Sequence, residues 1–350
     1  MLIVKVAFLY TEVAGYFLAC AQELSKSAEV LIFRWPVNKE APFDLSSYSN
    51  LTLLDRTDYS QQELEEKLHE FDPSAIICSG WMDKGYTRAA KTFNKKIPVV
   101  VTMDNHWTGS IKQHLATMTA PFHLKKVFTH AWVPGKPQAM FAERLGFTGE
   151  HLLRNFYCAD ANLFNEQFKR TFPTKKDRFP RRFLYVARYV EHKGIFEMWQ
   201  AFSELQEEEE TDWELWCLGT GDEWDNKMEH DKIKHIGFVQ PTELEQYVAQ
   251  TGVYILPSKF EPWGVSVQEF AICGFPLLLS NKIGAKWTYL KDGINGFEFQ
   301  AGSVKAIKEK MKEVMRMTDE ELVRMGEKSH EIGMSFTPEH WVENLLSILK

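Results

Sequence analysis

Short apolar runs alternate with longer amphipathic stretches along the whole of this chain. The runs of the first half read LIVKVAFLY, AEVLIFRW, SAIICSG and IPVVVTMD, and those of the second half read RRFLYVAR, WELWCLG, IKHIGFV, GVYILPS and FPLLLS. Such runs are typical of buried strands, and strands separated by helical stretches indicate βαβ units with parallel pairing. Because the series runs twice, we predict two α/β domains, each built on its own parallel sheet.

A basic segment lies between the two series. Residues 168–182 read FKRTFPTKKDRFPRR and hold seven Lys or Arg residues, one Asp and two prolines. This composition is typical of an exposed connection between domains. We therefore predict a first domain over residues 1–167, a linker over residues 168–182 and a second domain over residues 183–335.

The last residues, 336–350, predict a final amphipathic helix. In FTPEHWVENLLSILK, Thr337 suits the N-cap and Pro338 suits the first helical position. The apolar residues that then share one face include Trp341, Leu345 and Leu349. Because such a face must pack on apolar neighbours, we expect this helix to cross from the second domain back to the first.

Composition and charge narrow the function classes. The chain has 350 residues, of which 44% are apolar, enough for two buried cores. Its formal net charge of −7 gives no overall attraction for nucleic acid, whose binding domains are usually basic. The five cysteines are scattered and odd in number, so they indicate neither a metal motif nor a disulfide framework. With no apolar stretch near the ~20 residues that span a bilayer, we predict a globular cytoplasmic protein without a nucleic-acid partner.

Two glutamates flank a turn-like Pro-Trp-Gly in KFEPWGVSVQEF. The apolar run before this stretch predicts a strand, and VSVQEFAICG predicts a helix, so Glu261 falls at the carboxyl end of a strand. Open α/β sheets bind ligands at that edge. Two structural alternatives stay open: Glu261 beside a proline also suits a solvated turn, and Ser266-x-x-Glu269 matches a capping box.

Arg188 and Lys193 form a second candidate group. The run RRFLYVAR ends at Arg188, and Lys193-Gly194 opens the next predicted helix. A helix start offers free N–H groups and partial positive charge, so cations there suit a diphosphate. A solvated charged turn is the alternative for either residue alone. Gly219-x-Gly221 lacks the third glycine of a dinucleotide fingerprint, and a tight turn explains it.

Taken together, residues 181–300 resemble the donor domain of the retaining GT-B glycosyltransferases, family 4 or group 1. The resemblance is carried by VARYVEHKGIFE, WCLGTGDE, HIGFVQPTELEQYVAQTGVYILPSKFEPWGVSVQEFAICGFPLLLS and DGINGFEF, in the order and spacing of the family. It implies a GT-B fold, with two Rossmann-like doubly wound domains that face each other across a cleft.

The resemblance also implies roles for the residues of the second domain. Glu261 would contact hydroxyls of the donor sugar, Glu269 would hold the nucleotide ribose, and Arg188 with Lys193 would bind the diphosphate. The backbone that would approach the sugar and phosphates is that of Trp263, Gly264 and Val265. Most members have Phe or Tyr where this chain has Trp263.

The first half resembles the family more faintly. The loop after the first strand of the family carries adjacent glycines against the phosphates, whereas YTEVAGYF supplies only Gly15. The family places a His or Asp facing the reacting sugar after the strand that corresponds to IPVVVT, and MDNHW offers Asp104 and His106. The register favours Asp104, and either residue also suits an ordinary loop.

The implied function is a retaining, hexosyltransferase-type transfer of a sugar from a nucleotide-diphosphate sugar to a glycan, lipid-linked sugar or similar acceptor. No DxD triplet or metal-ligand spacing occurs, so we expect no bound catalytic metal and no cofactor. A nucleotide-sugar epimerase and a noncatalytic nucleotide-sugar-binding protein of the same architecture stay open as alternatives. The missing GxGxxG fingerprint disfavours a dehydrogenase.

The segment SIKQHLATMTAPFHLKKVF mixes apolar residues with Lys112, Lys125 and Lys126. This pattern suits either peripheral contact with the inner face of a membrane or a solvated helix face. Because the basic cluster is small, we favour the solvated face.

Overall fold

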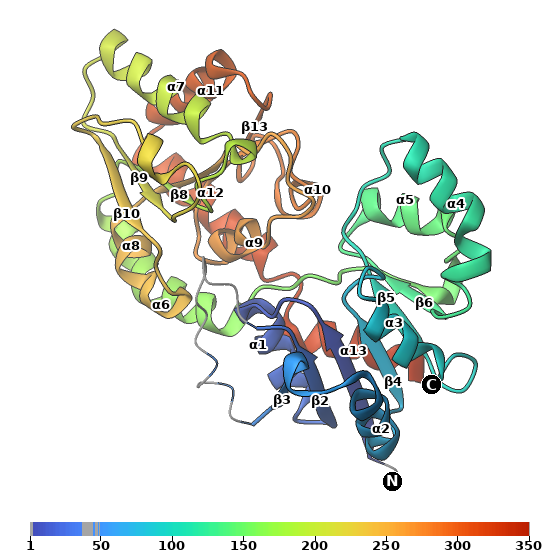
Figure 1. Ribbon diagram of the computed structural model, residues 1–350. Coiled ribbons are helices and arrows are strands. Elements are labelled where there is room, and N and C mark those ends of the chain that lie inside the picture. The colour runs from blue at the N-terminus through green and yellow to red at the C-terminus, as the bar shows by residue number, and fades with distance from the viewer. Residues whose placement is uncertain (1–2, 37–44, 46–47, 49, 350) are drawn as a thin grey trace. The chain divides into compact units, whose positions relative to one another are not determined.

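The apolar runs of the sequence form two parallel sheets, each in its own part of the chain (Figure 1). The computed structural model describes residues 3–36, 45, 48 and 50–349. The chain divides into unit 1, Met1–Ala159 with Phe336–Lys350, and unit 2, Asp160–Ser335.

The sheet of unit 1 has the strand order β3-β2-β1-β4-β5-β6-β7 over the described residues, and its neighbouring strands pair in parallel. The strands are β1 (Val4–Tyr10), β2 (Ala28–Arg34), β3 (Thr52–Asp55), β4 (Ala75–Cys78), β5 (Val99–Thr102), β6 (His130–Trp132) and β7 (Leu152–Leu153). The chain builds outward from β1 on one side and then continues from β4 on the other. The topological switch point of unit 1 therefore lies between β1 and β4.

Helices cover both faces of this sheet, which explains why its strands read as continuous apolar runs. The helices are α1 (Gly15–Leu24), α2 (Gln61–Phe71), α3 (Lys84–Lys91), α4 (Ile111–His123), α5 (Lys136–Arg144) and α13 (Pro338–Leu346). Val6 and Phe8 of β1 belong to the core cluster that includes α1 and α13 residues, whereas Ala7 and Leu9 belong to the cluster under α2, α3 and α5. Successive side chains of β1 thus enter opposite cores, as strand geometry requires.

The last helix is part of unit 1. Trp341 is 1% exposed, and its ring centroid lies 4.7 Å from that of Trp132 on β6. The indole Nε1 donates to Phe156 O at 2.7 Å. Leu345 is also buried, in the same core cluster as residues of α1.

The sheet of unit 2 has the order β10-β9-β8-β11-β12-β13 over the described residues, again with parallel pairing. The strands are β8 (Arg182–Val186), β9 (Glu214–Leu218), β10 (Ile233–Gly237), β11 (Val253–Leu256), β12 (Leu277–Ser280) and β13 (Gly296–Phe299). Here the switch point lies between β8 and β11. The predicted class, two doubly wound α/β domains, is confirmed.

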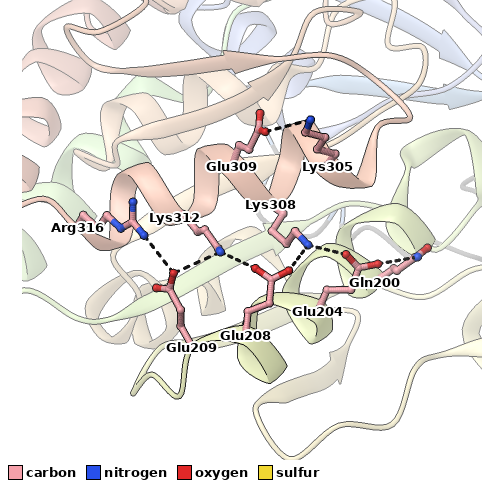
Figure 2. Close-up of polar contacts among 9 residues, drawn as sticks. All are labelled: Gln200, Glu204, Glu208, Glu209, Lys305, Lys308, Glu309, Lys312 and Arg316. Carbon is pink, nitrogen blue, oxygen red and sulfur yellow. Dashed lines mark hydrogen bonds and ion pairs between the residues drawn. The ribbon is translucent and has the colours of Figure 1, made fainter.

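The helices of unit 2 are α6 (Ala161–Asp177), α7 (Ile195–Glu208), α8 (Glu245–Gln250), α9 (Val265–Ile272), α10 (Lys286–Tyr289), α11 (Val304–Met315) and α12 (Asp319–Gly333). Helices α7 and α11 lie side by side, and alternating charges join their exposed faces (Figure 2). Lys308 of α11 bonds to Glu204 at 2.8 Å and Glu208 at 2.6 Å, and Lys312 reaches Glu208 at 2.5 Å.

The structure differs from the predicted linker over residues 168–182. Residues up to Asp177 continue α6, whose Phe164 and Phe172 are buried. Lys175 is only 1% exposed, and its Nζ lies 3.6 Å from the centroid of the Phe275 ring. The many Lys and Arg residues of this segment wrongly suggested an exposed linker. Apolar residues at helical spacing pack one face of the segment into unit 2.

Candidate functional site

Glu261 lies beyond the carboxyl end of β11, at the switch point of unit 2. Its backbone is fixed by an isolated parallel bridge to Ile283, in which Glu261 N donates to Lys282 O at 3.1 Å and Gly284 N donates to Glu261 O at 3.0 Å. A Cβ atom on Gly284 would lie 2.1 Å from Pro262 O, so only glycine allows this close approach. The loop before α9 is thus a built feature that holds Glu261 in one place.

The structure brings Glu261 and Lys193 together. Lys193 ends the short 3₁₀ helix η4 (Glu191–Lys193) after β8, and its Nζ forms an ion pair with Glu261 Oε2. Their side chains are only 14% and 13% exposed. The buried Ser258 hydroxyl lies 3.4 Å from the same carboxylate oxygen. The first carboxylate is therefore a held anion beside a cation, and the solvated-turn alternative does not describe it.

Two helices begin next to this pair, and both begin with a glycine. Gly194 precedes α7 with φ of 71°, and Gly264 precedes α9 with φ of 91°. Among the described side chains, none caps either helix. The first N–H groups of both helices therefore keep their capacity to bind an anion, and the helix dipoles add positive potential there.

A glycine turn holds the loop that carries Arg188. Cβ atoms on Gly219 and Gly221 would lie 2.0 Å from Ala187 O and 2.5 Å from Tyr189 O. Tyr189 N donates to Thr220 O at 2.9 Å, which closes the two loops on each other. The tight turn that explained these glycines from the sequence therefore has a further effect: it fixes the backbone on both sides of Arg188, whose side chain is exposed.

The structure contradicts the capping box at Ser266 and Glu269. Helix α9 begins at Val265 with Gly264 as its N-cap, so Ser266 already lies inside the first turn. Its hydroxyl instead bonds to Tyr254 Oη at 2.8 Å. The pattern was misleading because the N-cap is Gly264, a glycine at positive φ that lies two positions before Ser266.

Glu269 therefore lacks the structural role that its sequence pattern offered. Burial raises the pKa of its carboxyl to about 7, and the nearby negative charge of Asp160 adds to this shift. The residue as a whole is only half-buried, although its carboxyl group is enclosed by protein. A partly enclosed carboxyl of this kind is a suitable acceptor for sugar hydroxyls.

Trp263 contributes its backbone to this region and its ring to the core. The side chain is 4% exposed, and its ring meets Tyr289 edge-on at a centroid distance of 6.4 Å. Trp263 O accepts from Ala285 N at 2.9 Å. Its indole therefore fixes the loop from within, while the chain continues through Gly264 and Val265 into α9.

The candidates of unit 1 lie near their own switch point. Asp104 follows β5, and its Oδ2 accepts a hydrogen bond from Tyr157 Oη at 3.2 Å. The Tyr157 ring contacts that of Tyr16 edge-on at 5.5 Å, and Tyr16 follows Gly15, the first residue of α1. A tyrosine pair thus connects Asp104 with the loop after β1. His106 lies closer to α4, where its backbone O accepts from Gln113 Nε2 at 2.6 Å.

Sequence reasoning missed four contributors to this geometry. Ser258 and Gly284 support Glu261, Asp160 acts on Glu269, and Tyr157 holds Asp104. Gly284 could have been found as a glycine that follows a buried strand. Ser258 lies three residues before Glu261 in the same loop, but its spacing matches no motif. Asp160 and Tyr157 come near their partners only through tertiary contacts, so no local signal marks them.

Within the described residues, no three His, Cys, Asp or Glu side chains are grouped as metal ligands would be. The same part of the chain contains no helix with the length and apolar character that crossing a membrane requires.

The sequence of unit 2 matches a known protein family. Residues 166–331 match the family model of the glycosyl transferases group 1, a range that includes every candidate residue of unit 2. The resemblance that the sequence motifs indicated is therefore confirmed.

Part of the chain is also similar in sequence to a curated glycosyltransferase. The lipopolysaccharide core biosynthesis glycosyltransferase LpsE of Rhizobium meliloti is 27% identical over 154 residues. This match covers 42% of the present chain and spans 42% of the length of LpsE.

Solved structures share the fold over the whole chain. HepE of Anabaena, in a crystal structure with UDP-glucose, superposes with a TM-score of 0.74 at 14% identity and covers 98% of this chain and 99% of its own. A glycosyltransferase of Rickettsia africae superposes with a TM-score of 0.75 at 12% identity, covering 100% and 98% of the two chains. At these identities the likeness establishes the two-domain GT-B fold.

Proposed function

We propose that this protein is a glycosyltransferase that moves a sugar from a nucleotide-diphosphate sugar to an acceptor with retention of anomeric configuration. The observation that carries the proposal is the switch point of unit 2, where the Lys193–Glu261 pair lies beside two glycine-started helices. Positive potential and a held carboxylate at one place suit a substrate that combines a diphosphate with a sugar.

The positive groups would act on the leaving diphosphate. As the bond between the sugar C1 and the phosphate oxygen breaks, negative charge develops on that oxygen. Arg188, Lys193 and the first N–H groups of α7 and α9 would stabilise this charge without reorganising. The acceptor oxygen would form the new bond to C1 from the same face, and its proton would pass to the departing diphosphate.

The carboxylates would have separate roles. Glu261 would bind hydroxyls of the donor sugar and support the positive charge that develops on its ring. Glu269 would accept hydrogen bonds from the nucleotide ribose. Of the two candidates in unit 1, Asp104 is the better one to face the reacting sugar, because Tyr157 holds its side chain. His106 remains the second candidate.

The Lys193–Glu261 pair is compatible with both roles at once. An ammonium group has three N–H donors, so Lys193 can keep Glu261 while it donates to a phosphate oxygen. The pair would then orient the carboxylate toward the sugar in the free protein. Binding would require little rearrangement, which lowers its entropic cost.

The donor and acceptor classes follow from chemistry and from the relatives. HepE was crystallised with UDP-glucose, which makes UDP-hexoses the first donors to test. LpsE is named for lipopolysaccharide core biosynthesis, which supports a glycan or lipid-linked saccharide as acceptor. We propose that the reaction needs no metal ion and takes place in the cytoplasm as a step of carbohydrate biosynthesis.

A donor screen tests the proposal. UDP-, GDP- and ADP-sugars are compared for protection against thermal unfolding, and the best donor is then incubated with and without saccharide acceptors. We expect one nucleotide class to raise the melting temperature, and we expect release of its nucleotide diphosphate, including in the presence of EDTA. NMR of the product should show the anomeric configuration of the donor.

Other outcomes would support the alternatives. Epimerised sugar nucleotide without any acceptor would indicate an epimerase, and protection without turnover would indicate a binding protein. If no sugar nucleotide protects the protein, the proposed site is wrong.

A further inference from the structure

Helix α4 of unit 1 carries a row of large apolar side chains that face solvent. Ile111, Leu115, Met118 and Phe122 are 79%, 56%, 71% and 72% exposed. Their spacing of four, three and four residues places them within roughly 60° of arc on a helix that turns 100° per residue. They are therefore one continuous stripe.

The opposite side of α4 attaches the helix to unit 1. Ala120 is the buried residue of this helix, and Ala116 packs against the core cluster under α2, α3 and α5. Ala120 lies roughly 170° and Ala116 roughly 130° around the helix from the centre of the apolar row. The row thus points away from its own core, and Figure 1 shows α4 on the outside of unit 1. Single exposed apolar residues are ordinary, whereas a contiguous row indicates an interaction surface.

The charge around α4 has one sign. No Asp or Glu occurs between Asp104 and Glu143, although the chain as a whole has a net charge of −7. The same interval contains four lysines, Lys112, Lys125, Lys126 and Lys136. Lys112 and Lys126 are exposed. The apolar row therefore lies in a region of positive potential that would attract an anionic surface.

We propose that the apolar row of α4 docks on an anionic lipid surface. The row would enter the boundary between headgroups and acyl chains while the flanking lysines contact the headgroups, as amphipathic interfacial helices do. A second copy of this chain fits less well, because a two-fold interface would bring the same lysines face to face. The sequence pattern favoured a solvated helix face, but the structure shows that the solvated face is the apolar one.

Vesicle flotation tests the proposal with the full chain, independently of any donor chemistry. Vesicles of phosphatidylcholine with about 30 mol % phosphatidylglycerol are compared with pure phosphatidylcholine. We expect binding to the anionic vesicles, weakened when the salt is raised from about 0.1 to 0.5 M. The double variant Leu115→Glu, Met118→Glu should bind at least about tenfold more weakly, because two inserted apolar side chains are lost.

The matched control is the double variant Ile3→Glu, Ile294→Glu. These residues are 62% and 55% exposed and lie outside α4, so the control makes the same charge change elsewhere. It should bind as the wild type does, and circular dichroism should show that both variants are folded. Equal binding by the α4 variant and the wild type, or no binding to anionic vesicles, would overturn the proposal. A dimer that dissociates in the α4 variant without vesicle binding would identify a second copy as the occupant instead.

Discussion

The two units share one sheet plan but differ in what they place at its switch point. In unit 2 the loops after β8 and β11 carry a held ion pair and two glycine-started helices. In unit 1 aromatic rings lie beside the candidate residues, with Tyr16 of α1 packed edge-on against Tyr157, which follows β7. The comparison teaches that topology provides a place for a ligand, whereas the loop residues decide which ligand chemistry it suits.

In unit 1 the protonation state of Tyr157, which bonds to Asp104, depends on these aromatic neighbours. Burial raises the pKa of Tyr157 well above its ordinary value, and Tyr16 and Asp104 add to the shift. The phenol therefore stays protonated at physiological pH and donates a hydrogen bond to Asp104. The described residues of unit 1 orient one carboxylate and include no comparable set of anion-binding groups at the switch point. We therefore expect nucleotide affinity to depend on unit 2.

The largest effect is expected for Glu261→Gln. This substitution keeps the size of the side chain but removes the charge beside the sugar, so turnover should fall by about 100-fold or more. Affinity for the bare nucleotide diphosphate should change little, because that ligand lacks the sugar. Steady-state kinetics and calorimetry measure the two quantities separately.

The matched control for this substitution is Glu298→Gln. Glu298 pairs with Lys286 in the same unit, so its loss breaks a similar ion pair outside the candidate site. Turnover of the control should remain near that of the wild type. Equal losses of turnover and nucleotide affinity in Glu261→Gln would contradict the sugar-contact role.

The next effect concerns Arg188→Ala and Lys193→Ala. A hydrogen bond to a charged group is worth ~1.5 to 3 kcal/mol, so each variant should bind the nucleotide diphosphate about tenfold or more weakly. Lys193→Ala should also lower turnover further, because it leaves Glu261 without its cation. Titration calorimetry measures the affinities, with Lys305→Ala, an 83% exposed lysine of α11, as control. Wild-type affinity in a folded variant would remove that residue from the phosphate site.

The sequence predicted the parts of this site that are encoded locally. Apolar runs located β1, β2, β4 and β5 of one sheet and β8 to β12 of the other, whereas β3, β6, β7 and β13 were not predicted from such runs. The family motifs located Arg188, Lys193 and Glu261 in loops that meet at one edge of a sheet. This succeeded because parallel strands bring their carboxyl ends together, whatever the details of packing.

Features that depend on tertiary contacts were not predictable in this way. Lys175 has the charge of a linker residue, but it packs under Phe275 within α6. Ser266 has the spacing of a helix cap, but its hydroxyl accepts a hydrogen bond from Tyr254 Oη instead. The apolar row of α4 was visible as a pattern, yet only the structure shows that this row faces water.

A smaller effect is expected for Glu269→Gln, and it depends on pH. The carboxyl pKa is raised from 4.5 to about 7, so the folded protein binds this proton more tightly than the unfolded chain does. Stability therefore falls as the pH rises from 4.5 to 7, and the whole cost is present above pH 7. Glutamine removes this cost.

Calorimetry at two pH values checks this sign. At about pH 8 the variant should melt above the wild type, and at about pH 4 the two should agree. Nucleotide affinity at about pH 8 should fall roughly fivefold, since a neutral acceptor binds ribose hydroxyls less strongly than a carboxylate. If the difference in melting temperature is the same at both pH values and the affinity is that of the wild type, Glu269 has neither the raised pKa nor the ribose contact.

The smallest effect is expected on the outside of unit 2, at the charge ladder between α7 and α11 (Figure 2). Hydrogen bonds from Lys308 and Lys312 lower the pKa of Glu208 to about 2, so this contribution to stability is present above pH 4.5 and is lost as the pH falls toward 2. Because water and salt screen these groups, Lys308→Ala should shift the melting temperature at neutral pH by at most about 2 °C. The shift should shrink further as salt rises from about 0.1 to 0.5 M, because the Debye length falls from about 10 Å to about 4 Å and the exposed charges are screened more strongly. Turnover and nucleotide affinity should stay at wild-type values.

Ion pairing alone would then not distinguish the switch point from the surface: Lys308 and Lys193 both bond to glutamates, but only Lys193 does so beside two uncapped helix starts. A loss of nucleotide affinity in Lys308→Ala as large as in Lys193→Ala would show that the charge of unit 2 acts as a whole and that the switch point has no special role.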